Sequence, residues 1–209
     1  MEDINKLGRK ERERLQRKQE ILKSAARLFA EKGFNNATLE DIATSSEFGI
    51  GTIYNYFQNK EEIFKSIIES IFNSNMEILS STDCSTTGLI DFLKSYTKSI
   101  FEYFIDNRNE LLLLVSYVTG IGEKPVHLNG DLFKDKSCQM EDILKKRIKE
   151  GIENGEIRSL NPEYFQLIYH TMVFPYVTTQ LKKKKLDSSN ITEHVNFVLD
   201  ILFNGILIK

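Results

Sequence analysis

The side chains best suited to catalysis or metal binding are three histidines and two cysteines, and their spacing supports neither. His127, His170 and His194 are scattered and form no HxxxH or HExxH pattern. Cys84 and Cys138 are far apart and form no CxxC pair. Because the sequence also contains no glycine-rich phosphate loop and no nucleophile elbow, we expect no enzyme activity, no metal site and no cofactor.

A second group of candidate functional side chains is the series of basic residues at the start of the chain. Residues 1–27 contain nine Lys or Arg against five Asp or Glu, within a chain whose formal net charge is −2. Such a run can be the solvated face of a salt-bridged helix, or a basic arm that contacts phosphate groups. The run alone favours the first interpretation, so the segments that follow must decide.

A cluster of hydrogen-bonding side chains follows in a segment with the pattern of a short helix. Within residues 50–57, Ile53 and Phe57 are four positions apart and should both face a core. With those two buried, the other side chains of this segment cannot all be buried. They include Thr52, Tyr54, Asn55 and Tyr56.

Helical patterns on both sides would hold this segment in place. Apolar residues recur at helical spacing over residues 12–32, and Gly33 follows as a stop signal. Thr38 and Asp41 have the spacing of a capping box for another short helix, which should end near residue 45 or 46. Asn59 is a candidate N-cap for a long helix. Two short helices joined by a tight turn form a helix-turn-helix, whose second helix enters the major groove of DNA.

The segment from Ile21 to Phe64 resembles the DNA-binding domain of the TetR (tetracycline-repressor) family. It reads ILKSAARLFAEKGFNNATLEDIATSSEFGIGTIYNYFQNKEEIF. The family's anchors A-x-x-L-F-x-x-x-G-F, T-x-x-x-I-A and G-T-x-Y-x-Y-F-x-x-K-E are present in order and at the family's spacing. The resemblance fades from about Ser85 onward.

This resemblance implies a set of residues that meet double-stranded DNA. Thr38 would cap the first short helix near a phosphate, and Lys60 would contact a phosphate at the start of the next long helix. The other members would lie on the reading helix and touch base edges or backbone. They are Gly51, Thr52, Tyr54, Asn55 and Tyr56.

The turn between the two short helices departs from the family's pattern. The family often has Ala-Gly-Val-Ser where this chain has Ser46-Glu47-Phe48-Gly49. Glu47 stands where a glycine would adopt a positive φ without strain. We therefore expect this turn to have a somewhat different shape.

The remainder of the chain is also predicted to be helical. Apolar periodicity covers residues 87–107, 110–119, 131–154, 161–182 and 190–207, and a Gly- and Pro-containing loop covers 120–130. The expected fold class is all-α, with an N-terminal three-helix helix-turn-helix domain and a larger helical ligand-binding and dimerisation domain. Residues 1–60, which include the basic arm, would form the first domain, and residues 61–209 the second.

The last two helices carry apolar residues on more than one face, which requires a second partner. In the TetR family this pair forms a four-helix bundle with another subunit, so the resemblance implies a homodimer through about residues 161–207. Burial within one chain is the alternative. The resemblance also implies a small apolar effector bound among the central helices. Its candidate contacts are Phe92, Tyr96, Phe104, Tyr117, Tyr169, His170 and Phe174.

The function that these patterns predict is a DNA-binding transcriptional regulator, a repressor that a small apolar ligand releases from a palindromic operator. One alternative is a helix-turn-helix regulator without a small-molecule effector, and another is a helical enzyme whose N-terminal motif is incidental. No apolar run approaches the roughly 20 residues that span a bilayer, so we expect no membrane partner. Isolated cysteines suit a reducing compartment, which makes the cytoplasm the expected location.

Overall fold

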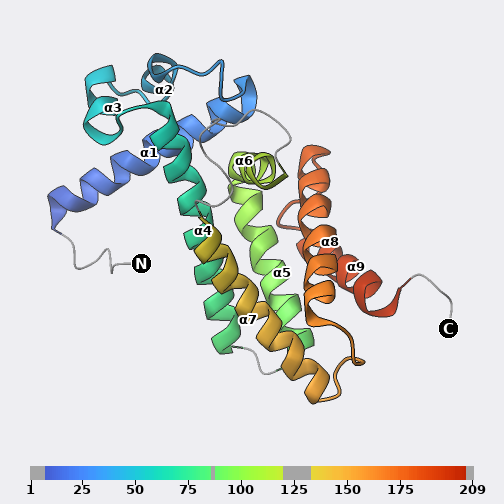
Figure 1. Cartoon of the computed structure of the whole chain (residues 1–209). Coiled ribbons are helices and arrows are strands. Elements are labelled where there is room, and N and C mark those ends of the chain that lie inside the picture. The colour runs from blue at the N-terminus through green and yellow to red at the C-terminus, as the bar shows by residue number, and fades with distance from the viewer. Residues whose placement is uncertain (1–7, 86–87, 120–132, 206–209) are drawn as a thin grey trace. The chain divides into compact units, whose positions relative to one another are not determined.

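The computed structural model describes residues 8–85, 88–119 and 133–205, and all the regular structure in these ranges is helical (Figure 1). The all-α prediction is therefore confirmed. The loop predicted over 120–130 lies outside the described residues. None of the described helices is long and apolar enough to cross a membrane.

The helices follow the predicted periodic segments closely, with ends that differ by a few residues. They are α1 (Arg9–Lys32), α2 (Leu39–Ser45), α3 (Ile50–Tyr56), α4 (Lys60–Ser85), α5 (Leu89–Asp106), α6 (Arg108–Thr119), α7 (Lys134–Glu153), α8 (Pro162–Lys182) and α9 (Ile191–Asn204). Backbone contacts divide the chain into two compact units. The first unit comprises residues 1–70 and 112–130, and the second comprises 71–111 and 131–209. The predicted domain boundary after residue 60 stays a prediction.

Side-chain caps fix the starts of several helices, as the sequence predicts for α2 and α4. The Thr38 hydroxyl accepts a hydrogen bond from the Asp41 amide at 3.0 Å, and the Asp41 carboxylate accepts one from the Thr38 amide at 3.1 Å. This capping box satisfies two amide donors at the start of α2. The Asn59 side chain accepts from the Glu62 amide at 2.9 Å at the start of α4. The Asn161 side chain does the same for the first turn of α8.

An aromatic cluster forms the core of the first unit. The ring centres of Phe29, Phe34 and Phe64 lie 5.2–5.9 Å apart, in tilted and edge-on pairs. Aromatic pairs at this separation add to the stabilisation from burial alone. The cluster ties α1 and the segment after it to α4, while α2 packs against both α1 and α3.

In the second unit, α5 is the most deeply buried helix and contacts α7, α8 and α9. Phe92, Leu93, Phe101 and Phe104 on this helix are completely buried. The close approach of α7 to α5 depends on Gly151, where an added Cβ would lie 2.6 Å from a Leu89 methyl group. Real side chains do not tolerate that distance, so no larger residue fits here without a shift of the backbone.

Candidate nucleic-acid interface

The second short helix, α3, is rotated so that its apolar pair faces the core. Ile53 and Phe57 are almost completely buried. Tyr54 is 56% exposed, and Gly51 and Asn55 are exposed as well. Thr52 and Tyr56 are half-buried at the edge of this face. The burial predicted for Ile53 and Phe57 is therefore confirmed.

Helical geometry identifies the centre of the exposed face. Successive residues of an α-helix are turned by about 100° around the axis. Gly51 and Asn55, which are four positions apart, consequently point away from the side that carries Ile53 and Phe57. Ile50 and Tyr54 flank this centre on one side, and Thr52 and Tyr56 flank it on the other.

The first helix supplies the positive charge. Residues 9–18 of α1 contain six basic and two acidic residues, and nearly all of them are exposed. Arg9 forms an ion pair with Glu13 at 2.8 Å, and the Lys18 ammonium lies 5.6 Å from the centre of the Phe57 ring. Figure 1 shows this end of α1 continuing past α2 and α3. Lys6, which also belongs to the predicted arm, lies outside the described residues.

Thr38 is exposed at the start of α2, where its hydroxyl oxygen is held by the capping box. Hydrogen bonds from the Lys32 ammonium and from the amide and hydroxyl of Thr38 hold the pKa of the Asp41 carboxyl below its usual value. Asp41 therefore stays ionised at neutral pH.

A helix-turn-helix preceded by an exposed basic helix is the architecture of a DNA reader. Residues 21–67 match the family described as "Bacterial regulatory proteins, tetR family". Residues 21–67 are therefore a TetR-family DNA-binding domain. The chain is a DNA-binding transcriptional regulator, as the sequence predicts.

Relatives of this chain are also regulators. The biofilm operon negative transcriptional regulator IcaR of Staphylococcus epidermidis is 33% identical over 91 residues, which are 42% of this chain and 49% of that protein. The solved structure of FadR from Bacillus subtilis with stearoyl-CoA is 23% identical, with a TM-score of 0.69 over 90% of this chain and 99% of that one. AibR with isovaleryl coenzyme A and operator DNA is 18% identical, with a TM-score of 0.69 over 87% and 97%. These structural likenesses show a shared fold.

The turn that departs from the TetR pattern keeps the backbone that a glycine would favour. Glu47 has a φ of 58°, in the left-handed region. Its amide donates to the Thr44 carbonyl at 3.3 Å, and the Phe48 amide donates to the Ala43 carbonyl at 3.0 Å. These two bonds form a Schellman motif that ends α2. The expectation of a different shape is therefore wrong at this position, since the glutamate adopts the strained conformation instead of changing the turn.

Lys60, which resembles the phosphate-contacting lysine of the TetR family, forms hydrogen bonds within the chain. The Lys60 ammonium donates to the carbonyl oxygens of Phe34, Asn35 and Ala37 at 2.9, 3.0 and 3.2 Å. It also lies 4.6 Å from the centre of the Phe34 ring. An ammonium group has three donors, so these bonds use all of them. Lys60 thus fastens the segment between α1 and α2 to the start of α4, a role that the sequence pattern did not indicate.

The candidate effector contacts fall in both units. Tyr117 belongs to the first unit, and the other six belong to the second. Five of the seven are buried, while His170 and Phe174 are half-buried. In the second unit, the Tyr169 and Thr97 hydroxyl oxygens are 2.8 Å apart, within hydrogen-bond distance. The ring centres of Phe104 and Phe174 are 6.2 Å apart. Burial lowers the pKa of His170, so its imidazole is neutral at pH 7.

The strained turn generates a first prediction. Replacing Glu47 by glycine should raise the free energy of unfolding by about 0.5–1 kcal/mol, because a glycine adopts a positive φ without the clash of a Cβ atom. Urea unfolding followed by circular dichroism measures the change. Glu47→Ala is the control, since it removes the same charge and keeps the Cβ. Equal stabilisation by both variants would show that charge, and not backbone conformation, is responsible.

The carbonyl contacts of Lys60 generate a second prediction. Lys60→Met keeps the alkyl stem and removes the ammonium, which should lower the free energy of unfolding by about 1–3 kcal/mol. Lys65→Met is the matched control, because Lys65 is exposed on the same helix. A Lys60→Met variant with unchanged stability but a salt dependence of DNA binding reduced by one contact would instead identify Lys60 as a phosphate ligand.

Proposed function

We propose that this chain is a homodimeric repressor that binds a near-palindromic operator and is released by a small apolar effector. The observation that carries the proposal is the exposed outer face of α3, which no part of the described chain needs for packing. The proposed base and backbone contacts are Gly51, Thr52, Tyr54, Asn55 and Tyr56, with Thr38 and the basic residues of α1 on phosphate. Lys60 is left out because its donors are in use within the chain.

Two helices support the proposed dimer. On α8, Phe165, Tyr169 and Val173 face the core of the chain, and the opposite side is apolar and exposed. That side includes Tyr164, Leu167 (61% exposed) and Ile168, and α9 adds Phe197 (55% exposed). Apolar side chains exposed at i, i+3 and i+4 mark a surface that another protein covers. We propose that a second copy of the chain covers it.

A dimer of this kind explains how a short helix can recognise DNA. A two-fold axis presents two copies of α3 to successive major grooves, which lie roughly 34–36 Å apart on one side of the duplex. The two half-sites then have the same sequence in opposite directions. One α3 helix alone would make only half of the contacts.

The proposed effector site is the aromatic cluster around α5 and α8. It contains Phe92, Tyr96, Phe104, Tyr169 and Phe174, with the neutral His170 beside them. The cluster is largely apolar, which suits an apolar ligand, and the Arg147 guanidinium lies 5.0 Å from the centre of the Phe92 ring. The Tyr96 hydroxyl is buried and makes no hydrogen bond within the described chain, so it could donate to a polar atom of such a ligand. FadR was solved with stearoyl-CoA and AibR with isovaleryl coenzyme A, which supports compounds with an acyl chain as the first to test.

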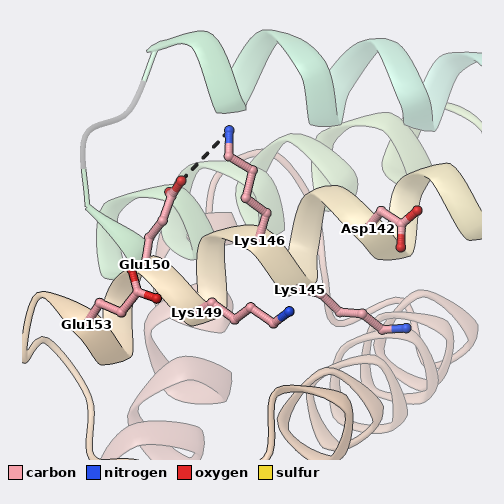
Figure 2. Close-up of a pocket in the computed structure, with 6 residues that line it drawn as sticks. All are labelled: Asp142, Lys145, Lys146, Lys149, Glu150 and Glu153. Carbon is pink, nitrogen blue, oxygen red and sulfur yellow. Dashed lines mark ion pairs between the residues drawn. The ribbon is translucent and has the colours of Figure 1, made fainter.

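A charged depression on α7 is a poorer candidate. It measures about 390 Å³, and charged side chains of this one helix line it (Figure 2). They are Asp142, Lys145, Lys146, Lys149, Glu150 and Glu153. Lys146 pairs with Glu150 at 3.8 Å, and Lys145 pairs with Glu141 at 3.5 Å. Solvated ion pairs of this kind provide little apolar surface for an apolar molecule to contact.

The dimer generates a third prediction. Leu167→Glu should yield folded monomers, because its side chain is exposed in the single chain and a buried carboxylate would disrupt the proposed interface. Leu199→Glu should unfold the chain, since Leu199 is buried within its own subunit. Light scattering and circular dichroism on the same samples separate the two outcomes. A Leu167→Glu variant that stays dimeric would place the interface elsewhere.

The proposed function itself is tested with the full chain and its own upstream DNA. We expect a gel shift that stearoyl-CoA, isovaleryl-CoA or a related acyl compound reverses, with a rise in Tm from the same compound. Linkage requires that operator DNA weakens binding of the effector by the same factor. Specific DNA binding that no compound alters would favour the regulator without an effector. Failure to bind any DNA sequence selectively would contradict the repressor altogether.

A further inference from the structure

We infer that the outer face of α3 reads A·T base pairs in the major groove, with Asn55 on an adenine and Ile50 on a thymine methyl group. The inference rests on the proposed DNA-binding function and specifies its target. It follows from which side chains stand on this face, and from which are missing there.

Asn55 lies at the centre of the exposed face, with its amide available. Its side chain is exposed, and no hydrogen bond to it is found within the described residues. An asparagine side chain carries one acceptor and two donors. In the major groove, adenine presents the N7 acceptor and the N6 donor side by side, and asparagine matches both at once. No other base offers that pair in the same geometry.

Gly51, one turn before Asn55, allows the helix to approach the bases closely. A Cβ at this position would meet no atom within 4 Å, so packing inside the chain does not require a glycine. Its φ is not in the left-handed region, so backbone conformation does not require one either. Glycine within a helix costs about 0.5–1 kcal/mol relative to alanine. The remaining reason for a glycine here is close contact with an external partner.

One side of the outer face is apolar. Ile50 is 38% exposed at the first position of α3, and Tyr54 follows it one turn later. Exposed apolar groups beside a reading position match the one apolar group in the major groove, the C5 methyl of thymine. Ile50 does not belong to the contact set predicted from sequence, because an isoleucine beside a buried helix face is ordinarily taken as core.

The chemistry that reads guanine is missing from this helix. Residues 50–56 read Ile-Gly-Thr-Ile-Tyr-Asn-Tyr and include no arginine or lysine, the side chains that contact guanine O6 and N7 most often. Lys60 is held by three carbonyl groups, and Lys18 lies over the Phe57 ring. The specific contacts of α3 should therefore fall on adenine and thymine.

The experiment begins with selection of bound DNA from a random pool by the full-length chain. We expect an inverted repeat with A·T pairs at the inner positions of each half-site. Each selected thymine is then replaced by deoxyuridine, which removes only the major-groove methyl. A single such replacement should weaken binding about fourfold, the value of one buried methyl group. Replacing the contacted adenine by 7-deazaadenine should weaken binding as well, because it removes N7.

Variants assign each effect to its side chain. Ile50→Ala should bind the thymine and deoxyuridine sites equally, and Asn55→Ala should no longer distinguish adenine from 7-deazaadenine. Val118→Ala is the matched control, because Val118 is an exposed apolar residue on α6. It should behave as the original chain does with every DNA.

Three results would overturn the inference. They are G·C pairs at the inner positions, indifference of the original chain to deoxyuridine, and Ile50→Ala with undiminished sensitivity to the methyl group. Each of these still requires a selected sequence, so each leaves the proposed function standing. A pool that yields no enriched sequence would contradict the proposed function itself, and this inference with it.

Discussion

The burial of Ile53 and Phe57 is the constraint on which the DNA-binding surface depends. These two side chains fix the rotation of α3 about its axis, because each is almost completely covered by the core of the first unit. Rotation of α3 about its axis by one residue position would expose Ile53 or Phe57. It would bury Asn55 or Gly51 instead. Lys60 also stabilises this arrangement, although it lies outside α3, because it holds the segment before α2 against the start of α4. The core of the first unit therefore determines which side chains the outer face of α3 presents.

Most of the fold could be predicted from the sequence because its signals are local. Thr38 with Asp41, Asn59 and Asn161 are each capping signals within a few residues of the amides that they satisfy. Contacts between distant residues could not be predicted in this way. The bonds from Lys60 to carbonyls 23–26 positions earlier leave no periodic trace, and the positive φ of Glu47 accompanies the hydrogen bonds that end α2. Periodicity also could not tell which apolar residues of α9 face the chain itself, since Val195 and Leu199 are buried while Phe197 is not.

The two apolar faces of α8 connect the proposed dimer to the proposed effector site. Tyr169 and Val173 pack inward with α5, and Leu167 and Ile168 face outward from the same turns of the helix. A ligand that enters among the inward residues must displace packed side chains, because close-packed interiors have little free space. Any rotation or shift of α8 that makes room also moves the outward face. An effector can then favour one arrangement of the two subunits over another, provided that it binds that arrangement more tightly.

Affinity and specificity are carried by different helices in this chain. The basic residues of α1 can neutralise phosphates, a contribution that is independent of sequence and weakens steeply with added salt. α3 contains no charged residue, so its contacts with bases release no counterions. The ratio of specific to non-specific affinity should consequently depend far less on salt than either affinity does. A net charge of −2 is compatible with DNA binding. In physiological salt, charges on the far side of the protein are screened, so only the charges that face the duplex interact with it strongly.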